Sequence, residues 1–304
     1  MNGRFLFILI LLIIWFILGW FFFNKYLCGL SAAVPVGEAN ETTKVIAPVK
    51  KDNSMWHISD GQAFDRRTSP FYEFARSSFA PISGGTGFIS TINATSDYLK
   101  THKDRSLIIT GYYDSLEVNN SILPDLGLAR ANAIKKELMS KGVSGSQIDI
   151  ASDYSTNEYY SLDTLRRGAL FAFTGKTGDS STRLNQIKSR LLGKPITIYF
   201  GTNQDNIALS SQQRTDFTDL IYYLDNVPGA KLDISGHTDN IGNYDVNVNL
   251  SQSRSQFVRS YLTTKGNIPN NRMVNQGFGP DKPVADNSTR AGRAKNRRVE
   301  VTLN

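Results

Sequence analysis

Asp239 and Arg254 are the side chains of this sequence whose type and spacing first suggest chemistry. Arg254 lies on the apolar stripe of a predicted helix over residues 250–264, and Asp239 closes a strand-like run fifteen residues earlier. The apolar residues that recur at helical spacing are Leu250, Phe257, Val258, Tyr261 and Leu262. Burying a guanidinium carries a desolvation penalty that a Coulomb pair often fails to offset. Two interpretations follow, a structural ion pair with Asp239 or a binding site for a charged ligand.

Catalytic and metal-binding arrangements are not visible in the sequence. The chain has three histidines and one cysteine, and they form no metal-ligand cluster and no nucleophile with a paired base. We expect His237, in the same block as Asp239, to be a strand-end residue near the site and not a catalyst. The sequence therefore predicts no catalytic residue, no metal and no cofactor.

Composition and charge narrow the class of protein. A chain of 304 residues with 40% apolar and 20% charged residues is typical of about two globular domains. The net charge is +7, and the densest basic cluster consists of Arg290, Arg293, Lys295, Arg297 and Arg298. Such a cluster could contact nucleic acid or acidic lipid. Because no nucleic-acid motif lies beside it, we expect a solvated loop with structural arginines and no nucleic-acid partner.

An uncharged apolar run covers residues 5–23. Its 19 residues match the length needed to cross a bilayer core and exceed the apolar core of a cleaved signal peptide. We expect an uncleaved transmembrane helix, although residues 31–33 are a weak candidate cleavage site. Lipidation of Cys28 is the other alternative, but the small residues of a lipobox do not precede it.

The flanks of that run predict its orientation. Arg4 precedes the run, and only Lys25 follows it closely, so the positive-inside bias puts the N-terminus in the cytoplasm. Residues 24–54 are small, polar and contain proline, as in a linker. The predicted location is the inner membrane, with a single span and with the C-terminal domains in the periplasm.

The remainder of the chain contains an internal duplication. Residues 106–115, 126–152 and 165–173 parallel residues 231–240, 250–276 and 296–304. Each copy has the order strand, helix, strand, helix, strand, strand, which predicts helices packed on one face of a small mixed sheet. In the second copy these elements are expected at 195–200, 210–224, 230–236, 250–264, 272–278 and 297–303.

The second copy resembles the OmpA-like C-terminal domain, the peptidoglycan-binding module shared with MotB and peptidoglycan-associated lipoprotein. The resemblance covers about residues 194–304 and rests on the blocks "ITIYFGTNQDNI", "GHTDNIGN", "NVNLSQSRS", "KGNIPNNRM" and "GFGPDKPVADNSTRAGRAKNRRVEV". It implies an α/β fold, an α+β sandwich, with two tandem βαβαββ domains after one transmembrane helix. The predicted domains are residues 55–175, a degenerate OmpA-like copy, and 194–304, with a linker at 176–193.

The resemblance also implies a ligand site. Asp239 and Arg254 correspond to the family's residues that bind the diaminopimelate of the wall stem peptide. A carboxylate and a guanidinium suit this ligand because its free end carries an ammonium group beside a carboxylate. By the same match, Thr238, Asn247 and the loop 279–287 are expected to shape the pocket.

The first copy departs from the pattern of the second. Asp114 and Arg130 are present, but sixteen residues apart instead of fifteen. Leu116 and Glu117 stand where the glycine of the second copy would follow, and the loop at about 152–163 is shorter. We expect the fold to be kept and the ligand site to be altered. Scaffolding or protein contact is the favoured role, with a second wall site as the alternative.

These observations predict a membrane-anchored protein that binds peptidoglycan non-covalently and is not an enzyme. It would tether an envelope complex or act as its stator, for example in a secretion apparatus, with protein partners in that complex. The alternative is an assembly or scaffold protein whose OmpA-like domains bind protein partners and not the wall. An enzyme acting on peptidoglycan is a weaker alternative, because no general acid–base arrangement supports it.

Overall fold

The computed structural model describes residues 56–68, 72–82, 86–154, 160–161, 163–175, 180–201 and 207–304. The predicted transmembrane helix at 5–23, the predicted linker at 24–54 and Cys28 lie outside these ranges. No helix within the described ranges has both the length and the apolar character to cross a bilayer. Residues 52–304 form one compact unit, which includes both segments predicted to be domains.

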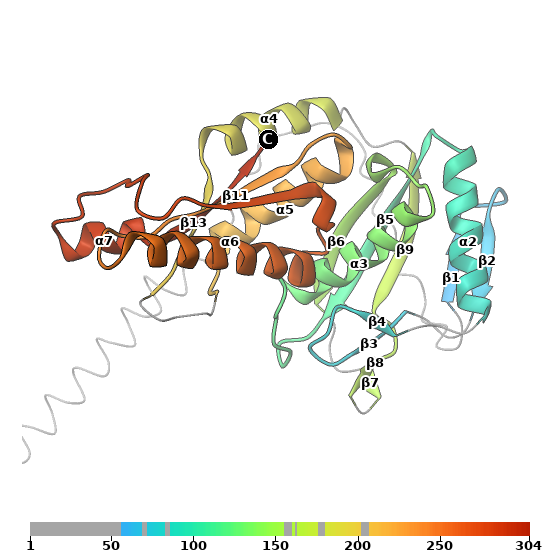
Figure 1. Ribbon diagram of the computed structural model, residues 1–304. Helices are drawn as coiled ribbons and strands as arrows, with labels where there is room; N and C mark the ends of the chain where they lie inside the picture. The colour runs from blue at the N-terminus through green and yellow to red at the C-terminus, as the bar shows by residue number, and fades with distance from the viewer. Residues whose placement is uncertain are drawn as a thin grey trace, which may run out of the picture. The chain divides into compact units, whose positions relative to one another are not determined.

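The C-terminal half contains a four-stranded sheet with the order β10-β13-β11-β12, and Figure 1 labels its two central strands, β11 and β13. Its strands are β10 (Ile196–Tyr199), β11 (Leu232–Gly236), β12 (Met273–Gly277) and β13 (Arg298–Leu303). Strand β11 pairs in parallel with β12 and antiparallel with β13, and β13 pairs antiparallel with β10. The small mixed sheet predicted from the sequence is therefore confirmed.

One face of this sheet packs against α5 (Ser211–Asn226) and α6 (Tyr244–Gly266). Alternate strand residues are buried because successive side chains of a strand point to opposite faces. The core formed in this way includes Ile196, Ile198, Leu232, Ile234, Val299 and Val301 from the strands and Phe217, Leu220, Val258 and Leu262 from the helices. Each such side chain contributes about 1.5–3 kcal/mol by leaving water.

Helix α4 (Ser180–Gly193) occupies most of the segment predicted to be a linker, residues 176–193, which corrects that prediction. Its Ile187 and Leu191 are one helical turn apart and are buried in the C-terminal core. Arg190 on α4 also forms ion pairs with Asp216 and Asp219 of α5. The segment is otherwise mostly polar, so its composition does not indicate that Ile187 and Leu191 are buried.

Helix α6 begins six residues before the predicted start at Leu250. The side chain of Asn243 caps it by accepting hydrogen bonds from the backbone N–H groups of residues 245 and 246. The predicted apolar stripe is partly wrong, because Leu250 and Phe257 are 41% and 39% exposed. Arg254 is nevertheless buried, with 8% of its surface exposed.

The N-terminal half contains a three-stranded sheet with the order β6-β5-β9. Strand β5 (Arg105–Tyr113) pairs in parallel with β6 (Ile148–Tyr154) and antiparallel with β9 (Ala169–Gly175). It thus has the same kinds of neighbour as β11 in the other sheet. Helix α3 (Leu126–Ser140) connects β5 to β6, as α6 connects β11 to β12.

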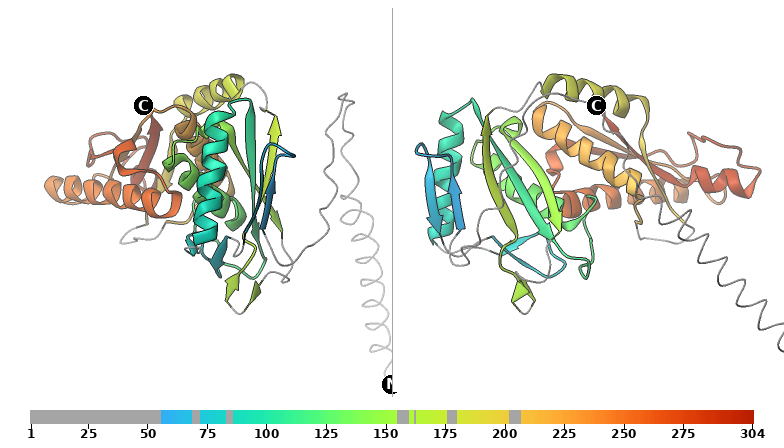
Figure 2. Two further views of the ribbon diagram at one scale, coloured as in Figure 1. Left: turned by 90° about the vertical axis from the view of Figure 1, so that its right-hand side faces the viewer. Right: turned by 180° about the vertical axis from the view of Figure 1, so that it is seen from behind.

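Smaller elements complete the fold. Helix α2 (Thr86–Thr101) lies beside the hairpin of β1 and β2 (Figure 2). The remaining elements are β1 (Trp56–Ser59), β2 (Asp65–Thr68), β3 (Glu73–Ala75), β4 (Pro81–Ile82), η3 (Gly145–Gln147), β7 (Tyr160–Ser161), β8 (Thr164–Leu165), η5 (Asn270–Arg272) and α7 (Arg290–Asn296). Strands β4, β3, β8 and β7 form a small sheet of their own, in that order.

Buried charges join the two halves. Asp225 of α5 forms ion pairs with Lys136 and, at 3.6 Å, with Lys135, both of α3. The side chains of Lys135 and Asp225 are each 3% exposed, and this burial lowers the pKa of the Lys135 amine despite the nearby carboxylate. Arg214 donates a 3.0 Å hydrogen bond to the carbonyl of Leu123 across the same boundary. Separation of the two halves would break these ion pairs and this hydrogen bond, so they stabilise the contact between the halves.

Candidate functional site

The predicted site residues lie at one edge of the C-terminal sheet. Strand β10 ends and β13 begins at this edge, because the register pairs Tyr199 with Arg298. Strand β11 also ends there, with Gly236 paired to Val299. Asp239 follows β11 after two residues. The sheet topology therefore brings the end of β10, the end of β11 and the start of β13 together.

Asp239 is held by the residue that precedes β13. The Nη1 atom of Arg297 donates a 2.8 Å hydrogen bond to Asp239 Oδ2, and the N–H of Ile241 donates to Oδ1 at 3.2 Å. The Asp239 side chain is 13% exposed. The backbone carbonyl of Arg297 accepts a 3.0 Å hydrogen bond from the N–H of Phe200. Arg297 therefore ties the carboxylate to the end of β10.

Arg254 reaches the same edge from α6. Its Cζ atom lies 5.2 Å from the ring centre of Phe200, within cation–π range, and its Nη2 donates to the carbonyl of Gly201 at 3.4 Å. A glycine in β11 allows α6 to come this close, since a Cβ on Gly236 would lie 2.1 Å from the carbonyl oxygen of Ser251. The sequence therefore sets the turn of α6 that carries Arg254 directly against β11.

Thr238 and Asn247 line the region around Asp239. Thr238 is 2% exposed, and its N–H donates to the carbonyl of Gly279 at 2.9 Å. Its hydroxyl oxygen is buried and has no hydrogen-bond partner among the described residues. Asn247 Nδ2 donates to the carbonyl of Ile241 at 3.0 Å. Both residues thus fix the loops on either side of Asp239.

Asn296 organises the loop over residues 279–287, and sequence reasoning missed it. This fully buried side chain accepts hydrogen bonds from the N–H groups of Val284 and Ala285 at 2.9 and 3.0 Å. Its Nδ2 donates to Asn287 Oδ1 at 2.8 Å. Its position directly before the two arginines at 297–298 is the sequence feature that could have indicated a structural role.

His237 packs beneath the site as a neutral side chain. It is 2% exposed, and its ring stacks on Phe278 with 5.5 Å between ring centres. Burial, together with the positive charge of Arg298, lowers the pKa of His237 to about 4. The imidazole is therefore uncharged near neutral pH.

The arrangement can, chemically, recognise a charged ligand without forming a covalent bond. Asp239 offers an oriented carboxylate, and Arg254 offers a guanidinium supported by an aromatic ring. Within the described ranges, no three His, Cys, Asp or Glu side chains gather as metal ligands would. The arrangement suits a small ligand that carries both an ammonium group and a carboxylate.

Residues 199–297 match the model of the OmpA family. This segment is an OmpA-like domain. It contains β11, α6 and β12 in full, and with them all four residues of the predicted ligand site. The predicted family is therefore confirmed for the C-terminal half.

Known proteins are similar to this chain over the OmpA-like domain. Outer membrane protein Omp38 of Acinetobacter baumannii is 38% identical over 112 residues, 37% of this chain and 31% of that protein. Peptidoglycan-binding protein ArfA of Mycobacterium tuberculosis is 42% identical over 77 residues, 25% of this chain and 23% of that protein. The solved peptidoglycan-associated lipoprotein from Burkholderia pseudomallei is 28% identical, and its TM-score is 0.33. The match covers 37% of this chain and 92% of that structure. The chain spans less than a third of the length of Omp38 and ArfA.

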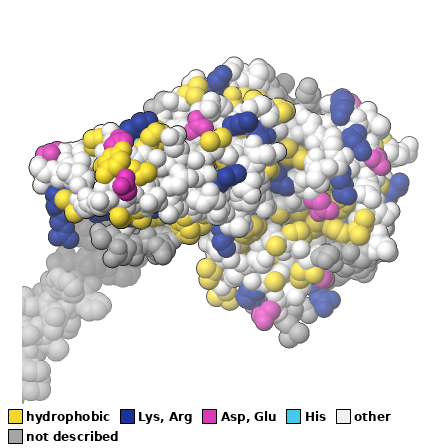
Figure 3. Space-filling model, viewed as in Figure 1, with side chains coloured by type: hydrophobic (Ala, Val, Ile, Leu, Met, Phe, Trp, Pro, Cys, Tyr) yellow, Lys and Arg dark blue, Asp and Glu magenta, His cyan; other side chains and the backbone are white. Residues whose placement is uncertain are grey.

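Arginines of the C-terminal basic cluster bind groups within the OmpA-like domain. Arg293 donates to the carbonyls of Asn287 and Ser288 at 2.8 and 3.0 Å. Arg298 Nε donates to Glu300 at 2.7 Å, and Arg297 holds Asp239. Figure 3 shows Lys and Arg side chains spread over the visible face and mixed with acidic ones. These three arginines are structural, as predicted.

The N-terminal half brings Asp114 and Arg130 to a comparable strand end but pairs Arg130 differently. Arg130 is fully buried and forms two hydrogen bonds with the Glu117 carboxylate, at 2.6 and 2.9 Å. Asp114 Oδ1 accepts a 2.6 Å hydrogen bond from the N–H of Leu116. The alteration predicted for this site therefore takes a specific form: the Glu117 carboxylate of the chain itself pairs with Arg130.

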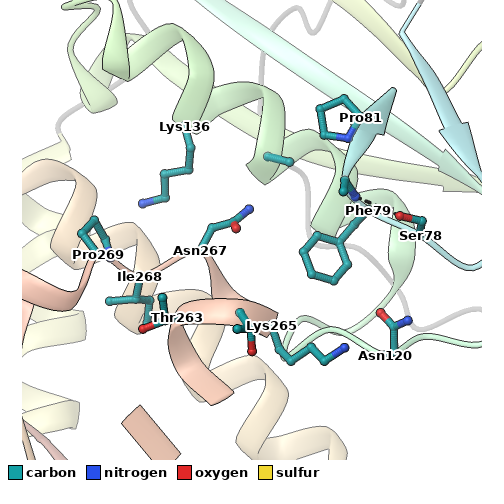
Figure 4. Close-up of a pocket in the computed structure, with 13 residues that line it drawn as sticks. Ser78, Phe79, Pro81, Asn120, Lys136, Thr263, Lys265, Asn267, Ile268 and Pro269 are labelled. Carbon is teal, nitrogen blue, oxygen red and sulfur yellow. Dashed lines mark hydrogen bonds between the residues drawn. The ribbon is translucent and has the colours of Figure 1, made fainter. Parts of the chain in front are cut away.

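A separate cleft of about 690 Å³ lies between α3 and the C-terminal end of α6 (Figure 4). Lys136 and Ala133 of α3 line one side, and Lys265 and Asn267 line the other. None of the predicted ligand-site residues lines this cleft. It is therefore a feature of the boundary between the two halves and distinct from the candidate site.

Proposed function

We propose that the OmpA-like domain binds peptidoglycan non-covalently, through the diaminopimelate of the stem peptide. The observation that carries this proposal is the convergence of Asp239 and Arg254 at one sheet edge. The carboxylate of Asp239 pairs with the ligand ammonium, and the guanidinium of Arg254 pairs with the ligand carboxylate. The hydroxyl of Thr238 and the backbone of the loop 279–287 supply further polar contacts.

Two features support this assignment over a purely structural ion pair. Asp239 forms its ion pair with Arg297, so Arg254 is not needed to neutralise it. ArfA, whose name describes it as peptidoglycan-binding, is 42% identical over 77 residues. A role in recognition, with no covalent chemistry, also accounts for a site whose proposed ligand-binding groups are one carboxylate and one guanidinium.

We further propose that the N-terminal half is a degenerate OmpA-like domain in tandem with the OmpA-like domain of the C-terminal half. Strands β5 and β11 each stand between a parallel and an antiparallel neighbour. Each strand also carries a glycine pressed against the following helix, since a Cβ on Gly111 would lie 1.9 Å from the carbonyl oxygen of Gly127. The same close contact at Gly236 supports a common origin of the two halves.

The whole chain is proposed to be a tether or stator of an envelope complex, such as a secretion apparatus. A single inner-membrane span at residues 5–23 would hold both domains in the periplasm, with protein partners in that complex. The outer-membrane location in the name of Omp38 supports a place in the cell envelope. The alternative is a scaffold protein whose two halves bind protein partners and not the wall.

Co-sedimentation of the full chain with purified sacculi of the diaminopimelate type tests the proposal. We expect the parent to sediment and the Asp239→Ala and Arg254→Ala variants to stay in the supernatant. Arg259→Ala is the matched control, because Arg259 lies on the same helix and instead bonds the carbonyl of Asn270 at 3.1 Å. If both site variants sediment like the parent, wall binding at this site is excluded and the scaffold role is favoured.

A further inference from the structure

The buried pair of Glu117 and Arg130 has the form of a ligand in a binding site. Both oxygens of the Glu117 carboxylate accept hydrogen bonds from the two terminal nitrogens of Arg130. The two side chains are 1% and 0% exposed. Parallel hydrogen bonds of this kind are the usual way in which arginine recognises a carboxylate.

Backbone groups complete a cradle around this carboxylate. The N–H of Ser77 donates to Glu117 Oε1 at 2.9 Å, and the N–H of Asp114 donates to Oε2 at 3.2 Å. Arg130 is itself oriented, because its Nη1 donates to the carbonyl of Tyr112 at 2.7 Å. Each carboxylate oxygen therefore has one guanidinium donor and one backbone donor.

The guanidinium of Arg130 has the same setting as that of Arg254. Its Cζ lies 5.2 Å from the ring centre of Phe74, and the corresponding distance from Arg254 to Phe200 is also 5.2 Å. Each guanidinium also donates to a backbone carbonyl. Arg130 Nε donates to Ser78 at 3.0 Å, and Arg254 Nη2 donates to Gly201 at 3.4 Å. The two arginines thus occupy equivalent positions in the two halves.

Glu117, the residue that pairs with Arg130, corresponds in position to a glycine of the C-terminal half. Glu117 lies three residues after Asp114, and Gly242 lies three residues after Asp239. Gly242 has a backbone φ of +100° and no side chain to reach Arg254. The loop that carries Glu117 is also fastened to the opposite segment, since Val118 N–H donates to Ser77 Oγ at 2.9 Å.

We propose that Arg130 is the centre of a carboxylate-binding site whose ligand is the chain's own Glu117. This site is closed to any carboxylate from outside, including a wall peptide. The proposed function assigns ligand binding to Arg254, whereas the filling of the Arg130 site by Glu117 does not rest on that function.

Chemical rescue tests the filled site directly. The full chain carrying Glu117→Ala is melted in sodium chloride and in sodium acetate of equal ionic strength. Loss of the buried partner should lower the melting temperature by roughly 5–15 °C in chloride. Acetate should enter the vacated space beside Arg130 and raise it by at least about 2 °C. The parent and the Glu117→Ala, Arg130→Met double variant should show no gain specific to acetate.

A folded Glu117→Ala chain that gains nothing from acetate would overturn the proposal. Should that variant fail to fold, native mass spectrometry of the parent with a diaminopimelate stem peptide decides instead. One bound peptide, lost in Arg254→Ala and retained in Arg259→Ala, is expected. A second bound peptide that depends on Arg130 would overturn the filled site. If no peptide binds to the parent, the proposed wall function fails, and acetate rescue of the milder Glu117→Asp variant then decides the filled site.

Discussion

The Nη1 atom of Arg297 lies 2.8 Å from Oδ2 of Asp239, so the carboxylate of the candidate site is paired and oriented without a ligand. The backbone carbonyl of the same arginine accepts a hydrogen bond from Phe200, whose ring supports Arg254. Arg297 thus connects the two charged groups of the site. A ligand that binds here meets groups whose directions are already set, which reduces the entropy cost of binding.

Removal of this link should weaken ligand binding without removing a proposed ligand contact. In Arg297→Ala the Asp239 carboxylate loses its partner, and we expect affinity for a diaminopimelate peptide to fall about 10-fold. Stability should fall by roughly 1–3 kcal/mol, because a mostly buried carboxylate is left unpaired. Calorimetric titration and thermal melting measure the two effects. Unchanged affinity in Arg297→Ala, beside a loss in Arg254→Ala, would show that Asp239 needs no such support.

Strands could be predicted from the sequence where the alternation of apolar and polar residues is regular. Strands β11 and β13 alternate apolar and polar residues, and the sheet they form has the expected mixed topology. The start of α6 was missed because apolar and polar residues alternate over residues 244–249, a period typical of a strand and not of a helix. The cap at Asn243 only becomes recognisable once the helix is seen. Helix α4 was missed because, among its described side chains, only Ile187 and Leu191 are buried in the core.

The internal contacts of the two sites could not be predicted in this way. Whether Arg297 points to Asp239 or to solvent depends on the crossing of β13 beside β11, which is a tertiary property. The sequence shows Glu117 in place of a glycine, but its contact with Arg130 depends on the path of the loop over residues 114–121. The ligand roles of Asp239 and Arg254 came from the family resemblance, and they stay predictions.

Glu117→Ala should destabilise the N-terminal half strongly. The change leaves the buried guanidinium of Arg130 without its carboxylate, which costs about 3–5 kcal/mol. Asp97→Ala is the control, because Asp97 and Lys100 form an ion pair with side chains 71% and 38% exposed, worth less than about 1 kcal/mol. Urea unfolding measures both changes. Equal losses in the two variants would contradict the view that Glu117 fills a buried site.

Asp225→Ala should uncouple the two halves. The variant removes the shared partner of Lys135 and Lys136 and leaves one of the two amines almost fully buried. We expect a loss of about 3–5 kcal/mol and a calorimetric unfolding curve that separates into two transitions. Asp219→Ala, which breaks a more exposed pair with Arg190, should keep the unfolding curve of the parent. A single sharp transition in Asp225→Ala would show that the charges do not hold the halves together.

His237 should make the C-terminal half sensitive to acid. The pKa of this imidazole is about 4 in the folded chain against 6.5 when unfolded, so the unfolded chain binds the extra proton between these values. Stability should therefore fall as the pH drops from about 6.5 to about 4, by on the order of 3 kcal/mol, with no further change from this group below. Unfolding free energies of the parent and His237→Phe across this range measure the effect. Identical slopes in the two proteins would contradict it.

The discrimination between two stem peptides tests the central claim most directly. Peptides that carry diaminopimelate or lysine at the third position differ by the carboxylate assigned to Arg254. The parent should bind the diaminopimelate peptide roughly 10–100-fold more tightly than the lysine peptide, as expected for one hydrogen-bonded charge pair. Arg254→Ala should bind the two peptides equally weakly, while Arg259→Ala should keep the preference. A parent that binds both peptides alike, or an Arg254→Ala variant that still prefers diaminopimelate, would contradict the account.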